Sequence, residues 1–395
     1  MKNIIGPARN FKPDSHKNNT ENTMNAIIKT AAAYAATLAG LLLVSSCHSE
    51  NRISGTLEDM GNDSLAVFIY NANTDRLSSA DTIAAENGKI SVSYKDTAMT
   101  MVYIMPVNGE KKGEVLNFTM LPGERLRISG TLSDPVYSGT PIYDGLAGFP
   151  DHREIEKKFA SLQEKAASLA GDDIIGRESV NAEFMELSAR RDSIYAEYIR
   201  QNPNDLTSGY LTLFMNPEKG LESYNLLGSA VKESAMGRLL DDVASYFVSS
   251  IEKEKNKQNM QPGKPAPEFN LKGLDGKEYT LASFRGKYVL LDFWGKWCYW
   301  CMKGMPQMKE YYAKYKNRIE FVGIDCRDSE DTWRETVESE GLDWTNLYNG
   351  NGQEILVNYA VEGFPTKVLI DKEGKIVQVF VGESEELYEK LDRLF

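Results

Sequence analysis

Two cysteines three residues apart are the residues of this sequence best suited to chemistry. Cys298 and Cys301 lie in the stretch 294–306, WGKWCYWCMKGMP, where aromatic side chains surround them. Two thiols at this spacing can bind a metal, form a structural disulfide, or exchange electrons with another disulfide. The rest of the sequence decides between these three roles.

The residues available as metal ligands argue against a metal site, and the short loop between the cysteines argues against a structural disulfide. The chain has 395 residues, and its cysteines and histidines are Cys47, Cys298, Cys301, Cys326, His16, His48 and His152. A structural zinc site requires four such ligands close together, and the histidines lie far upstream of the pair, so we predict no metal site. A structural disulfide that closes so short a loop gains little entropy. Redox exchange is therefore the favoured role.

The segments on either side of the pair predict how it would work. The apolar segment 288–293 predicts a buried strand before the pair, and the periodicity of 302–315 predicts a helix after it. Cys298 would then stand where a helix begins, and such a place lowers a thiol pKa from about 8.5 to roughly 3.5–7.5. An exposed Cys298 would be the attacking thiolate, and Cys301, about one turn later, would resolve the mixed disulfide.

Residues 263–395 alternate between the two kinds of element. The predicted strands are 288–293, 319–325, 366–370 and 376–381, and the predicted helices are 302–315, 330–340 and 383–394. Strands that alternate with helices indicate a mixed α/β sheet. We therefore predict a multidomain chain that ends in an α/β domain.

Two further parts precede this domain. Residues 52–145 predict an antiparallel β-rich domain, with strands at 52–57, 65–70, 89–94, 101–105, 115–120 and 125–129. The hexamer RISGTL occurs at 52–57 and again at 127–132, which we interpret as two similar strand-to-turn exits rather than a functional repeat. Residues 151–257 have helical periodicity and predict a helical connector. The segment 252–267, EKEKNKQNMQPGKPAP, predicts a polar linker.

Several separated motifs resemble known families. VLLDFWGKWCYWC at 289–301, Pro306, and EGFPT at 362–366 resemble the active-site strand, the kinked active-site helix and the cis-proline loop of thioredoxin-fold proteins. Residues 263–287 resemble the N-terminal hairpin of periplasmic TlpA/ResA-like reductases related to cytochrome c maturation. The motifs NGKISVSY and MLPGERLRISG resemble the β domain that precedes thioredoxin-like domains in Bacteroidota-type lipoproteins. The likeness over about 265–395 implies a thioredoxin-like thiol-disulfide oxidoreductase with an AhpC/TSA-redoxin-like domain.

This resemblance implies roles for two residues besides the cysteines. A cis Pro365 would leave backbone groups of Phe364 beside Cys298 free to pair with an extended client; the alternative is an ordinary turn proline. Asp292 interrupts an apolar strand. A buried carboxylate has a raised pKa and could take the proton of Cys301; the alternative is a core aspartate whose hydrogen bonds are satisfied.

The aromatic residues near the pair and one glycine set this chain apart. Trp297 is expected to cover the sulfurs and shape the docking face, or to serve packing alone. We assign Trp297, Tyr299, Trp300 and Phe364 to client binding. Tyr299 and Trp300 replace the Gly-Pro or Pro-His found between the cysteines of relatives, which leaves the direction of electron flow open. Many relatives carry a glutamate three residues after the second cysteine, and Gly304 stands there, so that proton relay is absent.

The N-terminal sequence predicts export. Residues 24–47, MNAIIKTAAAYAATLAGLLLVSSC, combine Lys29, an apolar run too short to span a membrane, and small residues before Cys47. The ending resembles a lipoprotein signal. This implies a signal peptide at 24–46, a lipidated Cys47 and a tether at 47–51; the alternative is a coincidental cysteine. We interpret 1–23 as a non-native upstream extension. The expected location is the cell envelope, lipid-anchored and facing the periplasm.

We therefore predict a membrane-anchored thiol-disulfide oxidoreductase. Its Cys298–Cys301 couple would reduce a disulfide-containing client protein, and a membrane thiol donor would re-reduce the couple. We expect no cofactor, and the net charge of −12 argues against a nucleic-acid partner. The alternatives are a thiol peroxidase of the related peroxiredoxin-like class and a client-binding protein with secondary redox activity. Cys326 is interpreted as a buried inert thiol, with partnership in the redox pair as the alternative.

Overall fold

The computed structural model describes residues 50–74, 76–107, 114–170 and 173–395. The predicted upstream extension, the signal peptide and the lipidated Cys47 lie outside the described residues. The chain forms two compact units that divide between Ala244 and Ser245. Within the described ranges, no helix combines the length and the apolar content that crossing a membrane would need.

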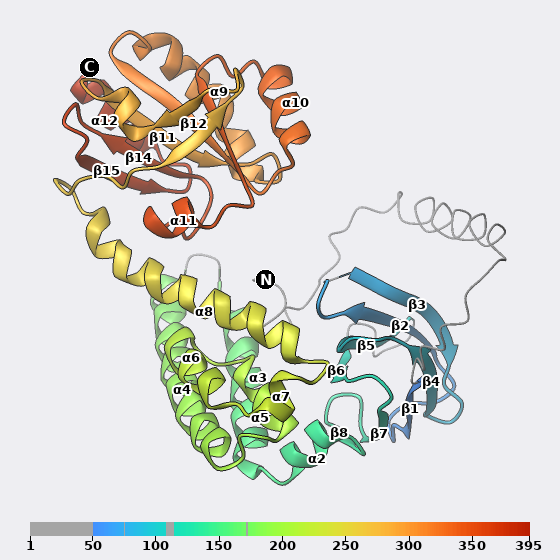
Figure 1. The fold of residues 1–395 in the computed structure, drawn as a ribbon. Helices are drawn as coiled ribbons and strands as arrows, with labels where there is room; N and C mark the ends of the chain where they lie inside the picture. Colours follow the sequence, from blue (N-terminus) through green and yellow to red (C-terminus); the bar gives the residue numbers. More distant parts are fainter. Residues whose placement is uncertain (1–49, 75, 108–113, 171–172) are drawn as a thin grey trace, which may run out of the picture. The chain divides into compact units, whose positions relative to one another are not determined.

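A seven-stranded sheet forms the centre of the C-terminal unit (Figure 1). β11 (Tyr288–Trp294) is buried along nearly its whole length, as expected for a central strand with both faces covered. β12 (Ile319–Cys326) pairs with it in parallel, and β14 (Thr366–Ile370) pairs with it antiparallel. The order is β10-β9-β13-β12-β11-β14-β15, where the remaining strands are β9 (Asn270–Gly273), β10 (Glu278–Thr280), β13 (Thr345–Gly350) and β15 (Ile376–Val381).

Helices cover both faces of this sheet. α9 (Tyr299–Tyr315), α10 (Glu330–Glu340) and α12 (Glu385–Leu394) share one buried cluster with Leu290 and Trp294 of β11, and we call this side the α9 face. The 3₁₀ helix η2 (Leu281–Phe284) and α11 (Glu354–Asn358) pack on the opposite face with Leu291 and Phe293. Because side chains alternate along a strand, Asp292 lies on the α9 face.

The predicted α/β architecture of this unit is confirmed. Each strand and helix predicted between 288 and 394 is present, and the hairpin implied by 263–287 is the antiparallel pair of β9 and β10. The sequence pattern missed β13 and α11. β13 reads TNLYNG, whose polar residues and glycine hide a strand pattern, and α11 is too short to show helical periodicity.

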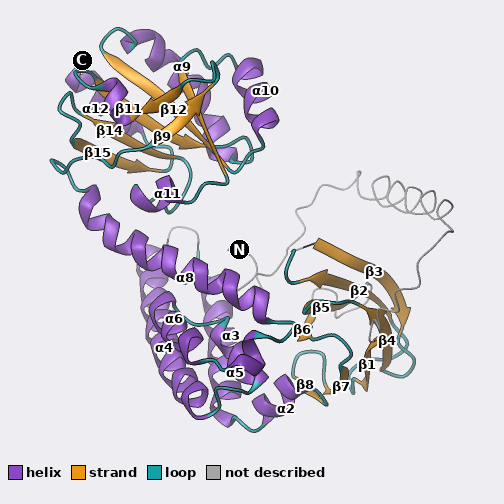
Figure 2. Cartoon of the chain, in the orientation of Figure 1, coloured by secondary structure: helices purple, strands orange, loops and turns teal. Residues whose placement is uncertain are grey.

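The N-terminal unit begins with two four-stranded sheets (Figure 2). The first has the order β4-β1-β7-β8, made of β1 (Glu50–Thr56), β4 (Lys89–Lys95), β7 (Arg125–Gly130) and β8 (Pro135–Ser138). The second has the order β3-β2-β5-β6, made of β2 (Ser64–Asn71), β3 (Arg76–Ala84), β5 (Thr100–Pro106) and β6 (Leu116–Met120). β3 was not predicted, because this edge strand is exposed almost throughout and shows no apolar alternation.

The two copies of the RISGTL hexamer lie on neighbouring strands. β1 and β7 pair in parallel, with Arg52 opposite Arg125, whereas the other pairings in both sheets are antiparallel. Parallel strands leave a sheet at the same edge. Both copies of the hexamer therefore end in a turn at that edge, in agreement with the interpretation as similar strand exits.

Seven helices in the described part of the chain follow these sheets: α2 (Pro141–Ala147), α3 (Pro150–Ser168), α4 (Ile174–Gln201), α5 (Leu206–Thr212), α6 (Pro217–Leu226), α7 (Ser229–Lys232) and α8 (Gly237–Lys257). The polar linker expected at 252–267 is wrong in its first half. α8 continues to Lys257, and the 3₁₀ helix η1 (Gln258–Met260) extends it. The Asn256 side chain donates to the Val357 carbonyl at 3.1 Å, and Met260 is buried, so this polar segment is held against the C-terminal unit.

Candidate active site

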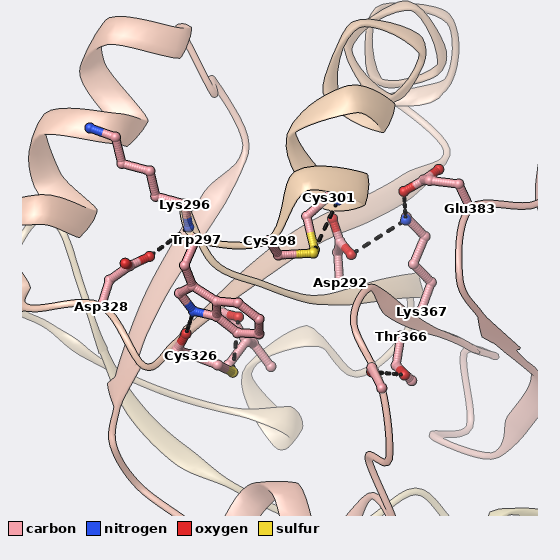
Figure 3. The surroundings of a disulfide bond; sticks show 12 residues. Asp292, Lys296, Trp297, Cys298, Cys301, Cys326, Asp328, Thr366, Lys367 and Glu383 are labelled. Carbon is pink, nitrogen blue, oxygen red and sulfur yellow. Dashed lines mark hydrogen bonds and ion pairs between the residues drawn. A yellow bond between two sulfur atoms is a disulfide. The ribbon is translucent and has the colours of Figure 1, made fainter. Parts of the chain in front are cut away.

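The cysteine pair lies where β11 ends and α9 begins (Figure 3). Cys298 is the N-cap residue of α9, and its Sγ accepts the N–H of Cys301 at 3.1 Å. A disulfide joins Cys298 to Cys301, so the structure holds the pair in its oxidised state. Because the N–H of Cys301 points at Cys298 Sγ, the same geometry would stabilise a thiolate on Cys298 after reduction.

Both cysteines are buried in this state, whereas we expected an exposed Cys298. Cys298 is 5% exposed and Cys301 is 2% exposed. The disulfide belongs to the buried cluster of the α9 face, together with Trp294 and Met305. The expectation of an exposed Cys298 is therefore wrong for the oxidised state, because the disulfide bond to Cys301 holds the sulfur of Cys298 at the end of this cluster.

Aromatic side chains, not sulfur, reach solvent beside the pair. Trp297 is 47% exposed, and its Nε1 donates to the carbonyl of Cys326 at 2.8 Å. Its ring packs edge to face against that of Phe364, with the ring centres 5.1 Å apart, and the guanidinium of Arg327 lies over both rings. Trp297 is thus fixed by β12 on one side and by the loop before β14 on the other, which suits both a packing role and a docking role.

The two residues between the cysteines are less constrained. Tyr299 is 69% exposed and Trp300 is 55% exposed, and their rings meet edge to face. The ammonium of Lys303 lies 4.7 Å from the centre of the Trp300 ring. These side chains present an aromatic surface with a positive charge at the start of α9.

The loop before β14 has the conformation that the resemblance implied. The peptide bond between Phe364 and Pro365 is cis. Thr366 Oγ1 donates to the Gly363 carbonyl at 2.8 Å, and the carbonyl of Pro365 accepts the N–H of Gly382 at 2.8 Å. The contact between Phe364 and Trp297 brings this loop to the active-site turn.

Asp292 is buried on the α9 face, as expected from its place in an apolar strand. It is 5% exposed and lies opposite Lys367 of β14 and Gly323 of β12 in the sheet register. Its Oδ1 lies 3.6 Å from Lys367 Nζ, longer than a hydrogen bond. Burial raises the pKa of Asp292, the Lys367 ammonium lowers it, and Glu383 raises it.

Two charged residues that sequence reasoning missed complete this group. Lys367 is 2% exposed, and its Nζ lies 2.6 Å from Glu383 Oε1 (Figure 3). A Cβ atom at Gly304 would overlap the carboxylate of Glu383. Residue 304 itself is not a glutamate, but the carboxylate of Glu383 occupies the space beside it. The available signal for Lys367 was a lysine inside an apolar strand. Glu383 carries no such signal.

A second buried carboxyl group, also missed, lies at the end of β12. Asp325 is fully buried opposite Trp294, and burial, with a smaller effect of Asp328, raises the pKa of Asp325 to about 8. Asp328 Oδ2 accepts the N–H of Lys296 at 2.6 Å and so holds the active-site turn. Asp325 and Asp328 therefore interact with each other, and Asp328 also contacts the backbone of the active-site turn at Lys296.

Cys326 is a free and fully buried thiol. Its Sγ lies 3.4 Å from the Ile324 carbonyl, and burial raises the pKa of the thiol well above its usual range. These properties agree with the interpretation as an inert thiol. In the described ranges no group of three or more His, Cys, Asp or Glu is arranged to hold a metal.

Comparisons with known proteins cover the C-terminal unit. The AhpC/TSA family model matches residues 262–379. Thiol-disulfide oxidoreductase ResA of Bacillus thuringiensis (strain Al Hakam) is 40% identical over 129 residues, 32% of this chain and 74% of that protein. ResA of Bacillus subtilis (strain 168) is 34% identical over 127 residues, 32% of this chain and 70% of that protein. The solved thioredoxin domain of a thiol-disulfide oxidoreductase from Bacteroides vulgatus is 30% identical, with a TM-score of 0.32, and covers 34% of this chain and 97% of that chain.

Proposed function

The chain belongs to the thioredoxin-like thiol-disulfide oxidoreductases of the AhpC/TSA family, and from that premise we propose that it reduces disulfides of client proteins through Cys298 and Cys301. The observation that carries the proposal is the position of the pair. Cys298 caps α9 and accepts the N–H of Cys301, and the loop with the cis Pro365 meets the same turn through Phe364 and Trp297.

The proposed reaction proceeds in two exchanges. The Cys298 thiolate attacks one sulfur of the client disulfide, a mixed disulfide forms, and the other client sulfur leaves as a thiolate. Cys301 then loses its proton to Asp292 and attacks Cys298 Sγ, which forms the Cys298–Cys301 disulfide and releases the second client thiolate. The dithiol loses two electrons and the client disulfide gains two.

The client would be recognised at the surface beside the pair. We assign backbone pairing with an extended client segment to Phe364, whose backbone groups the cis Pro365 would leave free, and contact with client side chains to Trp297, Tyr299 and Trp300. The exposure of the three aromatic residues supports this assignment. Large, rigid aromatic side chains contribute strongly at protein interfaces.

The proposed location is the periplasmic side of the cell envelope. The pattern of residues 24–47 supports secretion and lipid attachment at Cys47. Disulfides persist outside the cytoplasm, so clients would be available there. A membrane thiol donor is proposed to return the oxidised pair to the dithiol. We favour reduction of clients because residues 263–287 resemble periplasmic reductases.

Replacement of Cys298 tests the proposal. Reduction of insulin disulfides in the presence of dithiothreitol, followed by turbidity, is expected with the full chain and is expected to vanish in Cys298→Ser. Cys326→Ser is the matched control, because that thiol is fully buried, and it should retain the activity. Undiminished insulin reduction by Cys298→Ser would overturn the proposed function. Peroxide consumption that depends on Cys298, without insulin reduction, would favour the thiol peroxidase instead.

A further inference from the structure

Three charged side chains, two of them buried and one half-buried, lie next to one another near the disulfide on the α9 face (Figure 3). Asp292 lies on β11, Lys367 on the neighbouring β14, and Glu383 just before α12. The side chains of Asp292 and Lys367 are almost fully buried, and that of Glu383 is 20% exposed. The ammonium forms a hydrogen bond with the outer carboxylate at 2.6 Å and stays 3.6 Å from the inner one.

The position of the outer carboxylate depends on a missing side chain. Gly304 lies inside α9, and a Cβ there would overlap the carboxyl carbon and both oxygens of Glu383. Glycine in the middle of a helix is less favourable than alanine. At Gly304 the space that a side chain would fill is occupied by the carboxylate that binds Lys367.

Resting on the proposed function, we propose that Glu383 is a positioning residue: it holds the Lys367 ammonium back from Asp292 and thereby keeps Asp292 able to accept the proton of Cys301. The proton goes from the Cys301 thiol to the Asp292 carboxylate. The resulting thiolate forms the bond to Cys298 Sγ while the bond from Cys298 to the client breaks. An ammonium placed directly on Asp292 would make it a weaker base, because a nearby opposite charge lowers a carboxyl pKa.

The other groups near Asp292 do not replace Lys367. The Tyr388 phenol of α12 and the Cys326 thiol both feel the charge of Asp292, and burial raises the pKa of each, so both stay neutral between pH 5 and 9. β12 contributes Gly323 opposite Asp292, and α9 contributes Cys301 to the buried cluster of this face. The balance between Lys367 and Glu383 therefore sets the electrostatic environment of Asp292.

The two exchanges can be separated with dithiobis(nitrobenzoate), an aryl disulfide that releases one coloured thiolate at each step. The reduced full chain is mixed with this probe in stopped flow between pH 5.5 and 9. The first release reports the attack by Cys298 and the second reports resolution by Cys301. In the wild-type chain the rate of the second release should fall at low pH as Asp292 becomes protonated. We call this fall the acidic limb of the pH profile of the second phase.

Glu383→Gln should move this acidic limb of the second phase to lower pH by about one unit or more, because Lys367 is then free to approach Asp292. The first phase should not change. Lys367→Met should move the limb in the opposite direction, since Asp292 then lacks a cation and faces Glu383 alone. A role limited to stability would move neither limb.

Gly304→Ala provides a second test that keeps every charge. The new methyl group should displace the Glu383 carboxylate, so the limb should shift in the same direction as in Glu383→Gln, and alanine favours the helix. Glu385→Gln is the matched control: this exposed carboxylate also contacts α9, through Gln307, and its loss should leave the limb in place. An unmoved limb in both Glu383→Gln and Gly304→Ala would overturn the inference. Absence of either release from the wild-type chain would instead overturn the proposed function.

Discussion

Replacement of Asp325 with asparagine is expected to stabilise the C-terminal unit at neutral pH. Asp325 is fully buried, and burial together with Asp328 raises its pKa from 3.8 to about 8. A carboxyl group with a raised pKa binds its proton more tightly in the folded state. The stability linked to that proton is therefore fully present below about pH 3.8 and is lost as the pH rises toward 8. Asparagine has a similar shape and no proton to lose.

The size of the effect follows from the interval between the two pKa values. One pKa unit corresponds to about 1.4 kcal/mol, so the gain in free energy of unfolding for Asp325→Asn is at most about 4 kcal/mol at pH 7 and about 6 kcal/mol above pH 8. Asp343→Asn is the matched control. This aspartate is exposed in the same unit, and its replacement should change the free energy of unfolding by less than about 0.5 kcal/mol.

Tryptophan fluorescence measures this unit alone. All five tryptophans of the chain lie in it: Trp294, Trp297, Trp300, Trp333 and Trp344. Guanidinium unfolding of the oxidised full chain at pH 5, 6, 7 and 8 should show the advantage of Asp325→Asn growing by about 1.4 kcal/mol per pH unit up to pH 7 and by less between pH 7 and 8, where Asp325 begins to ionise in the folded state. A difference that stays constant across this range would refute the reasoning, because it would mean that Asp325 is not protonated in the folded unit.

Two further predictions concern the aromatic surface. Trp297→Phe keeps a ring against Phe364 but removes the Nε1 donor to the Cys326 carbonyl, so it should lower the free energy of unfolding by about 1 kcal/mol, measured by guanidinium unfolding; an unchanged value would show that this hydrogen bond has no net effect. Tyr299→Ala and Trp300→Ala remove exposed rings and should change stability by less than about 0.5 kcal/mol while raising KM for insulin more than for the aryl disulfide. Equal effects on both substrates would argue against client docking at these residues.

The fold was predictable where side-chain pattern and packing coincide. β11 is apolar because helices cover both faces of the sheet there, and that same burial makes its sequence recognisable. β3 forms its ladder with β2 at a solvent-exposed edge, so backbone pairing rather than burial of side chains holds it, and no apolar pattern marks it. Charged residues near the end of α8 were interpreted as a linker, although glutamate and lysine are good helix formers.

The site was predictable only where it is local in sequence. Cys298, Cys301 and Asp292 lie within one strand and the turn after it, and Pro365 lies in a short motif of its own. Asp325 was passed over because it follows a run of apolar residues and looks like the polar end of a strand. Its burial depends on the neighbouring β11 and β13, which the pattern of one strand does not show.

Gly304 shows how a physical argument can go further than a local motif. The glycine alone indicated that no carboxylate stands three residues after Cys301. Yet Lys367 lies in the predicted strand 366–370, TKVLI, and a lysine buried there must be paired with an acidic group, because an isolated ammonium is too costly to bury. Asp292 on the adjacent strand could satisfy it in part. Because Glu383 takes the closer position, the pairing leaves Asp292 incompletely neutralised, and this is the state in which a buried carboxylate remains a useful base beside a thiol.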